Sequence, residues 1–203
     1  MNSFSIVIPT FNNSFYLKQT VKSVLNQIHN NFEILIIDDG STDDTSKIFK
    51  NIKDKRIKYL YLNHTGIPAK VRNFGIRKSN YDWICFLDSD DIWSPSKLCE
   101  CNIFIEQGYD FICHDMDIIN EKNNQKFKVS FFKKDISFLK LLNNGNIIFN
   151  SSVVVKKDLL FDVGLFNENK SIIAAEDYNL WLKITKKSKN IIFINKKLGK
   201  YRI

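Results

Sequence analysis

The sequence predicts an α/β fold whose sheet is mainly parallel and is flanked by helices. Short apolar runs alternate with stretches of helical periodicity through the first 91 residues, and each run ends in polar or acidic residues. Alternation of this kind is typical of parallel strands joined by right-handed crossovers. A chain of 203 residues is also long enough to bury roughly 70% of its unfolded surface, so it can fold without disulfides or metals.

The predicted strands of the first half lie at residues 4–9, 32–37, 57–62 and 83–87. They are apolar on both faces, as strands covered by helices on each side must be. A first helix is predicted by apolar side chains at helical spacing from Leu17 to about residue 27. A second helix begins after Gly40, with Thr42 or Asp43 as its cap, and a third carries Arg72.

The second half predicts a less regular order of elements. We expect helices at 95–107, 136–142 and 157–164 and from Ala174 onward, strands at 109–116, 127–132, 147–155 and 191–198, and a polar turn at 117–126. No internal repeat or low-complexity linker interrupts the chain. The expected organisation is therefore one continuous domain with two lobes.

Composition limits the classes of function. The net charge is +8, and lysine clusters lie toward the C-terminal half. Contact with an anionic membrane face is one reading of this charge and a solvated basic surface is the other. No nucleic-acid-binding motif is present. The sequence has neither a membrane-spanning apolar segment nor a signal peptide, so we expect a cytoplasmic protein, and peripheral contact with the inner face of the membrane stays open.

The four cysteines are expected to be reduced thiols. They are Cys85, Cys99, Cys101 and Cys113. Their spacing, even with His114 added, matches no common zinc pattern. Cytoplasmic proteins rarely keep disulfides. The cysteines therefore predict neither a metal centre nor a disulfide framework.

An acidic turn follows the fourth predicted strand. Asp88, Asp90 and Asp91 come within four positions after the apolar run, where open α/β sheets bind ligands. Carboxylates so close together repel one another unless a cation or a proton joins them, and oxygen ligands suit Mg²⁺ or Mn²⁺. A simple acidic cap for the next helix is the alternative.

Five segments in order resemble the inverting glycosyltransferases of family 2. They are Ser5–Asn12 (SIVIPTFN), Asp38–Asp43 (DDGSTD), Arg72-Asn73-x-Gly75, Asp88–Asp91 (DSDD), and Glu176-Asp177 before Leu180-Trp181-Leu182. The resemblance implies a GT-A-type, Rossmann-like fold with a smaller acceptor-side lobe. It implies a single catalytic domain over 1–203, with a nucleotide-sugar-binding half over 1–91 and an acceptor-side half over 92–203.

The resemblance assigns the donor site to the first half. Asp39 matches the carboxylate that accepts a hydrogen bond from the uracil or another base edge, and Asp38 is its structural neighbour. Thr10 and Phe11 match residues that contact the base, although Phe11 could equally be a core residue. Arg72 matches a basic residue near the diphosphate, where it pairs with phosphate or holds an acidic side chain.

Three other residues next to these motifs are expected to have surface or core roles and not to contact a ligand. We expect Lys70 to be a surface lysine and His64 to be an exposed loop histidine. Trp181 is expected to be a core residue. None of the three is assigned to the site.

The acidic turn and the Glu176-Asp177 pair are assigned the chemistry. The resemblance implies that Asp90 binds a divalent Mn²⁺ or Mg²⁺, that Asp88 reaches the ribose or a metal-bound water, and that Asp91 supports them. Asp177 matches the catalytic base that deprotonates an acceptor hydroxyl. Glu176 either supports it or only favours the helix dipole.

The expected function is inverting, metal-dependent transfer of a sugar, most plausibly from a UDP-sugar, to a glycan or lipid-linked glycan in bacterial surface polysaccharide synthesis. A nucleotide-sugar-binding module without transfer activity is the first alternative. A nucleotidyltransferase is the second, but the loop after the first strand has neither the glycine nor the basic residue that such enzymes use. Family members commonly continue past a Tyr-Arg pair such as Tyr201-Arg202, so a C-terminal extension is expected to be missing.

Overall fold

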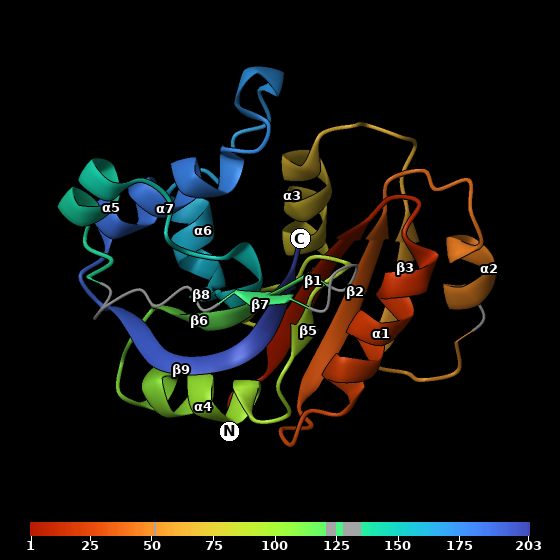
Figure 1. Cartoon of the computed structure of the whole chain (residues 1–203), viewed down its shortest axis with the longest axis horizontal. Helices are drawn as coiled ribbons and strands as arrows, with labels where there is room; N and C mark the ends of the chain where they lie inside the picture. Colours follow the sequence, from red (N-terminus) through yellow and green to blue (C-terminus); the bar gives the residue numbers. More distant parts are fainter. Residues whose placement is uncertain (51, 121–124, 128–134) are drawn as a thin grey trace.

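The structure is a computed structural model that describes residues 1–50, 52–120, 125–127 and 135–203. One sheet runs through the molecule in the order β3-β2-β1-β4-β8-β6-β9-β5, and β7 pairs with β6 (Figure 1). The strands are β1 (Phe4–Thr10), β2 (Phe32–Asp38), β3 (Ile57–Tyr61), β4 (Trp83–Phe86), β5 (Ile92–Trp93), β6 (Phe111–Asn120), β7 (Gln125–Phe127), β8 (Val154–Lys156) and β9 (Ile191–Arg202).

The first four strands form the predicted parallel half of the sheet. β1 pairs in parallel with β2 and β4, and β2 pairs in parallel with β3. Thr10 lies opposite Asp38 in this register, and Val7 lies opposite Phe86. The C-terminal ends of β1, β2 and β4 therefore meet at one edge, which is where the acidic and polar segments follow the strands.

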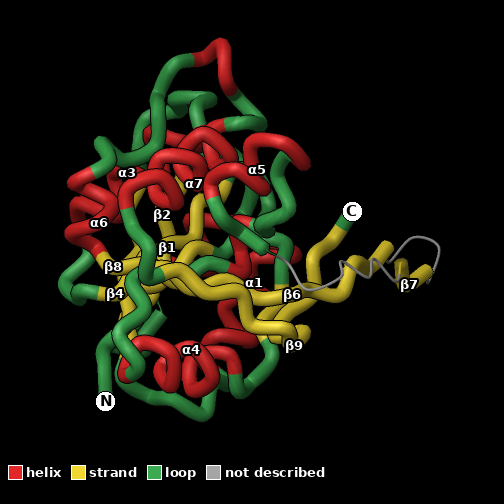
Figure 2. The backbone as a smooth tube through the Cα atoms, turned by 90° about the vertical axis from the view of Figure 1, so that its left-hand side faces the viewer, coloured by secondary structure: helices red, strands yellow, loops and turns green. Residues whose placement is uncertain are grey.

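Helices cover both faces of this sheet, as predicted. They are α1 (Ser14–Leu25), α2 (Thr45–Phe49), α3 (Pro68–Lys78), α4 (Lys97–Glu106), α5 (Phe138–Asn144), α6 (Lys157–Asp162) and α7 (Glu176–Lys187), with 3₁₀ turns η1 (Asn150–Ser152) and η2 (Lys170–Ile172). Figures 1 and 2 show α3, α5, α6 and α7 on one side of the sheet and α4 on the other. Alternating side chains of β1 divide between the two layers: Val7 joins the core with α3 and α7, and Ile6 and Ile8 join the core with α1 and α4.

Helix α3 lies close against β1 because Gly75 has no side chain. A Cβ atom built at this position would come within 2.5 Å of Val7 Cγ1. Any other residue would push the helix away from the sheet. The close approach matters for the site because Arg72, one turn earlier, is carried by the same helix.

Several predictions for the second half were wrong in extent. The predicted turn at 117–126 is partly strand, because β6 continues to Asn120 and its polar outer part pairs with β9 around Lys200. The predicted strand at 147–155 is instead the 3₁₀ turn η1 followed by the short β8, which is antiparallel to β4. The last strand continues to Arg202, and β5 was not predicted. Most of the predicted strand 127–132 lies outside the described residues.

Two composition-based expectations can be compared with the structure. No helix in the described part of the chain is long and apolar enough to cross a bilayer. All four cysteines are free thiols, as expected, and Cys85, Cys101 and Cys113 are buried. Within the described ranges, no cluster of three or more His, Cys, Asp or Glu side chains could by itself hold a metal ion.

Candidate active site

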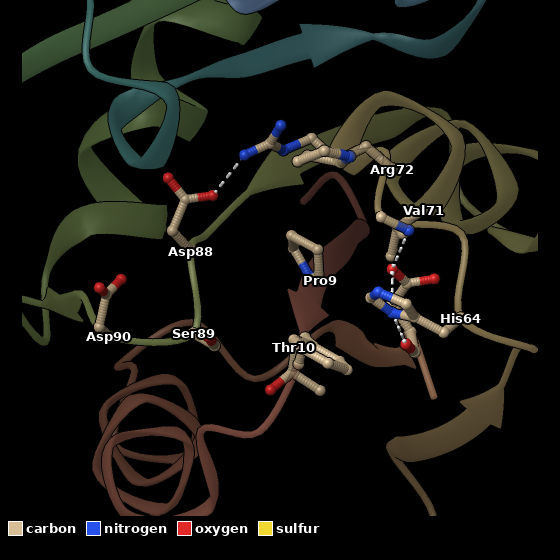
Figure 3. A pocket seen from close by; sticks show the side chains of 12 residues that line it. Pro9, Thr10, His64, Val71, Arg72, Asp88, Ser89 and Asp90 are labelled. Atoms are coloured by element: carbon tan, nitrogen blue, oxygen red, sulfur yellow. Dashed lines mark hydrogen bonds and ion pairs between the residues drawn. The ribbon is translucent and has the colours of Figure 1, made fainter. Parts of the chain in front are cut away.

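A cavity of about 360 Å³ opens at the C-terminal edge of β1, β2 and β4. Its lining includes Thr10, Phe11, Asp39, Arg72, Asp88 and Asp90, which are the predicted donor-site and metal residues, together with His64, Gly66 and Ser89. Figure 3 shows Asp88 and Asp90 on one side, His64 on the other, and Pro9 and Thr10 between them. The fold thus brings segments far apart in the sequence into one site.

The Asp39 carboxylate is held by the loop after β3. Its Oδ1 accepts the Thr65 N–H at 2.8 Å and its Oδ2 accepts the Gly66 N–H at 3.0 Å. Each carboxylate oxygen has a second lone pair, so Asp39 can still accept a hydrogen bond from a ligand. Its neighbour Asp38 is fully buried and accepts hydrogen bonds from the Ser41 N–H and the Tyr59 hydroxyl, so it shapes the turn rather than the cavity.

An aromatic pair closes this end of the cavity. The Phe11 and His64 rings are stacked, with 4.3 Å between centroids and 25° between planes. His64 Nδ1 lies 2.8 Å from the Asp39 carbonyl oxygen and 3.2 Å from its Oδ2. Phe11 is therefore exposed in the cavity rather than in the core, and His64, expected to be only an exposed loop residue, also belongs to the site.

Arg72 links the two halves of the chain. From α3, its Nη2 donates to Asp88 Oδ1 at 2.8 Å and its Nη1 donates to Glu176 Oε1 at 2.9 Å. Both Arg72 and Glu176 are buried, so Glu176 is not merely an exposed acid near the α7 dipole. Of the two roles considered for Arg72, holding acidic side chains is the one that this geometry presents.

Polar groups from distant segments fix the acidic turn after β4. Asp88 Oδ1 also accepts the Asn150 side-chain N–H at 2.9 Å, and the Asp88 N–H donates to Ser151 Oγ at 2.9 Å. The Thr20 hydroxyl lies 2.9 Å from the carbonyl oxygen of Ser89 and 2.8 Å from that of Asp91. These contacts determine where the carboxylates of the turn point.

Asp91 faces inward, away from the cavity. It is fully buried and its Oδ1 accepts the Arg202 N–H at 3.0 Å. The Arg202 guanidinium donates to the Asp90 carbonyl oxygen and, at 2.6 Å, to Gln19 Oε1. Burial and the neighbouring Asp88 carboxylate raise the pKa of Asp91 to about 8. Asp91 therefore contacts the last strand and does not face the cavity.

Asp88 and Asp90 form an electrostatic site that suits a hard cation. Burial, and then the Asp88 charge, raise the pKa of Asp90 above its usual range, although the Arg202 guanidinium opposes the shift. A divalent ion would add positive charge beside both carboxylates. Mg²⁺ and Mn²⁺ typically bind through one or two carboxylates, with phosphates and waters completing the shell. The residues present therefore fit such an ion bound together with a diphosphate.

Asp177 lies in the first turn of α7, next to Glu176. Its Oδ2 accepts the Asn146 side-chain N–H at 3.2 Å. Burial raises the pKa of Asp177 above the usual aspartate value, while the Tyr178 N–H and Arg72 oppose the shift. A carboxylate with a raised pKa is a stronger base than a free aspartate. Trp181, one turn later, is fully buried in the core as expected, and Lys70 is an exposed surface lysine.

Sequence reasoning missed the residues that hold the site together. They are His64, Asn146, Asn150, Ser151 and Arg202. Most are neutral polar residues in loops, and such residues have no periodicity that would single them out. Arg202 was noted only as part of a Tyr-Arg pair near the end of the chain, and that pair was its one available signal.

Comparisons with known proteins agree with this geometry. Residues 5–163 match the family model "Glycosyl transferase family 2". An uncharacterized glycosyltransferase of Rickettsia bellii is 37% identical over 98% of this chain and 28% of its own length. The Escherichia coli protein WfgD, named UDP-Glc:alpha-D-GlcNAc-diphosphoundecaprenol beta-1,3-glucosyltransferase, is 33% identical over 94% of this chain and 72% of its own.

Solved structures share the fold. S. aureus TarS 1-349 in complex with UDP-GlcNAc superposes with a TM-score of 0.83 at 25% identity, over 99% of this chain and 58% of that one. The mannosyltransferase PcManGT from Pyrobaculum calidifontis, in complex with GDP-Man and Mn²⁺, gives 0.75 at 14% identity, over 98% and 56%. The chain spans about a third of the length of the three Rickettsia relatives that are 37% identical to it. The match of the family model to most of the chain shows that it belongs to glycosyl transferase family 2.

Proposed function

We propose that this domain transfers a sugar from a UDP-sugar to a hydroxyl group of a lipid-linked glycan, with inversion at the anomeric carbon and with a divalent metal ion. One observation carries the proposal. Arg72 joins the acidic turn at the donor cavity to the first turn of α7, where Asp177 lies. This bridge would hold the proposed donor site and the proposed base in a fixed relation to each other.

Residues of the parallel half would bind the donor. Asp39 can accept the imide N–H of uracil, and the exposed Phe11 ring offers a stacking surface for the base. Asp88, whose Oδ1 is already engaged by Arg72 and Asn150, has its second oxygen for the ribose or for a metal-bound water. Residues 1–91 are the proposed nucleotide-sugar half, and residues 92–203 the proposed acceptor half.

Asp90, with Asp88 beside it, would hold the metal ion. A bound Mn²⁺ or Mg²⁺ neutralises the charge that develops on the departing diphosphate. The GDP-Man and Mn²⁺ found with PcManGT support this choice of ion. The raised pKa of Asp90 supports the same choice, because burial and the neighbouring Asp88 charge make the free carboxylate unfavourable and a cation would relieve this.

Asp177 would act as the general base. It takes the proton from the acceptor hydroxyl as that oxygen bonds to the anomeric carbon from the face opposite the diphosphate. The bond from the anomeric carbon to the diphosphate oxygen breaks in the same step, and nucleoside diphosphate leaves. An α-linked donor then gives a β-linked product, without a covalent intermediate on the protein.

The donor and acceptor classes rest on the relatives. WfgD is named as using UDP-Glc and a GlcNAc-diphosphoundecaprenol acceptor, and TarS was solved with UDP-GlcNAc. These names support a UDP-hexose donor and a lipid-linked acceptor in polysaccharide synthesis.

Two variants separate transfer from donor binding. Asp177→Asn is expected to bind UDP with Mn²⁺ like the wild type but to lose transfer, because only the base is removed. Asp90→Ala is expected to lose the metal-dependent part of UDP binding in calorimetry. Wild-type protein that binds UDP but transfers no sugar to any acceptor would support a binding module instead, and release of pyrophosphate rather than UDP would support a nucleotidyltransferase.

A further inference from the structure

Helix α5 presents an apolar face that nothing in the described chain covers. Leu139 is 66% exposed and Leu142 is 53% exposed. Their spacing of three positions places them on one side of the helix. Leu141 points the other way into the core, and the Tyr178 hydroxyl donates to its carbonyl oxygen at 2.7 Å. The helix is thus anchored on α7 while two leucines face solvent.

Exposed lysines accompany these leucines. Lys140 lies between them in the sequence, and Lys186 and Lys187 lie at the end of α7. Lys186 Nζ is 5.8 Å from the centroid of the Phe138 ring, so the end of α7 reaches α5. Figures 1 and 2 both place the two helices side by side.

The segments that include α5 and the later turns of α7 are rich in lysine. Residues 136–157 and 178–189 together contain seven lysines and no aspartate or glutamate. Asp135, just before α5, is the nearest acid along the chain. A surface that combines exposed leucines with lysines complements a bilayer whose headgroups are anionic.

The exposed face also borders the proposed acceptor side. Asn146 follows α5 and donates its side-chain N–H to Asp177 Oδ2. Only a short stretch of chain separates Leu142 from Asn146. An acceptor whose lipid remained in the bilayer would therefore meet Asp177 close to the membrane surface.

We propose that the α5 face, defined by Leu139, Lys140, Leu142, Lys186 and Lys187, docks this domain on an anionic membrane. The leucines enter the interfacial region and the lysines contact the acidic headgroups. The inference rests on the proposed function, since a lipid-linked acceptor requires the domain to work at a membrane. It adds the surface and the orientation in which the domain would do so.

Vesicle co-sedimentation of the full chain tests the proposal. The probes are vesicles of phosphatidylcholine and vesicles of phosphatidylcholine mixed equally with phosphatidylglycerol. The wild type is expected to bind the mixed vesicles, and Leu139→Glu/Leu142→Glu is expected to bind them at least tenfold more weakly. The matched control is Ile103→Glu, because Ile103 is a similarly exposed aliphatic residue on α4, on the opposite side of the sheet.

A second pair of variants tests the charge. Lys186→Glu/Lys187→Glu is expected to lose binding to the mixed vesicles. Lys18→Glu/Lys22→Glu changes charge equally at two exposed lysines of α1 and is expected to bind like the wild type. Neither pair touches the residues of the proposed active site.

Several results would overturn the proposal. They are wild-type protein that does not bind the mixed vesicles, equal binding by the leucine variant, and an equal loss in Ile103→Glu. Self-association that the leucine variant abolishes, without any vesicle binding, would show that the face joins two copies of the chain. Stabilisation by UDP with Mn²⁺, measured on the same samples without vesicles, reports on the proposed function separately.

Discussion

Arg72 and Glu176 form a buried ion pair, with 2.9 Å between Nη1 and Oε1, although 104 residues separate them along the chain. The second arm of the same guanidinium holds Asp88. A planar guanidinium can bind two carboxylates at fixed angles, whereas a lysine amine is a single point of charge. Arg72 therefore sets the position of the first turn of α7, and with it Asp177, relative to the acidic turn.

The first prediction concerns this bridge. Arg72→Lys is expected to lower sugar transfer at least a hundredfold, because one amine cannot hold both Asp88 and Glu176. Removing a partner from a buried ion pair typically costs about 3–5 kcal/mol, so the melting temperature should also fall. Initial rates and thermal melts measure the two effects. Arg77→Lys is the control on the same helix, since Arg77 is exposed and lies 3.9 Å from Glu168.

Glu176→Gln tests the same bridge from the α7 side. This variant keeps an oxygen acceptor for Arg72 Nη1 but removes the charge. We expect UDP binding to be retained and transfer to fall, because the donor residues stay in place while α7 loses its ionic anchor. Transfer at the wild-type rate in both Arg72→Lys and Glu176→Gln would contradict the positioning role.

The second prediction concerns the Phe11–His64 stack. Phe11→Ala is expected to weaken UDP binding about tenfold, which corresponds to about 1.4 kcal/mol and lies within the range for one base–aromatic stack. His64→Ala is expected to weaken UDP binding less, because His64 stacks on Phe11 and its side chain is half exposed. Isothermal titration calorimetry measures both affinities.

Phe15 supplies the control for this experiment. It is 68% exposed on α1 but does not line the cavity. Phe15→Ala should therefore bind UDP like the wild type. If Phe11→Ala did so as well, the stacking role of Phe11 would be wrong.

The third prediction concerns Arg202. Its guanidinium reaches the Asp90 carbonyl oxygen and Gln19, and it also lies over the Tyr16 ring at 4.8 Å. A lysine at position 202 cannot make these contacts together, so the acidic turn after β4 should be less well ordered in Arg202→Lys. The metal-dependent affinity for UDP should therefore fall severalfold. UDP affinity with and without Mn²⁺ is the measurement. A deficit equally large without the metal would show a general loss of folding instead. Arg56→Lys, at the partly exposed pair with Asp54, serves as control.

The sequence was sufficient for the part of the site that follows from local order. Buried strands are continuous apolar runs, and parallel strands place their C-terminal ends at one edge, so the acids after β2 and β4 could be expected at one place. Arg72 was assigned to the same place by the resemblance to family 2. Periodicity also predicted that helices cover both faces of the sheet. These features depend on residues near one another in the chain.

The features of the fold and the site that the sequence did not predict depend on contacts between distant segments. Nothing around Arg202 indicates that it will lie beneath the turn at Asp90, because the pairing of β6 with β9 decides this. The outer part of β6, around Asp117, reads as a turn because its side chains are polar, and it is a strand because β9 pairs with it. His64 was interpreted as an exposed loop residue without a role in the site. Its stacking on Phe11 could not be predicted, because it depends on where the fold places the loop.

The fourth prediction is the pH dependence of transfer. Asp177 must be deprotonated to act as a base, and burial raises its pKa. Transfer is therefore expected to be present at neutral pH and to fall as the pH drops through a pKa that lies above the usual aspartate value of about 3.9. Asn146 donates a hydrogen bond to the charged form, which favours that form.

Asn146→Ala should consequently move the acid limb of the kcat/KM profile to higher pH. Loss of one hydrogen bond of about 1 kcal/mol corresponds to a shift of roughly half a unit to one unit. UDP binding measured over the same pH range serves as the control, because Asp90 also has a raised pKa. If binding and transfer fell together, the limb would belong to the donor site. An acid limb unmoved in Asn146→Ala would likewise remove Asp177 as the titrating base.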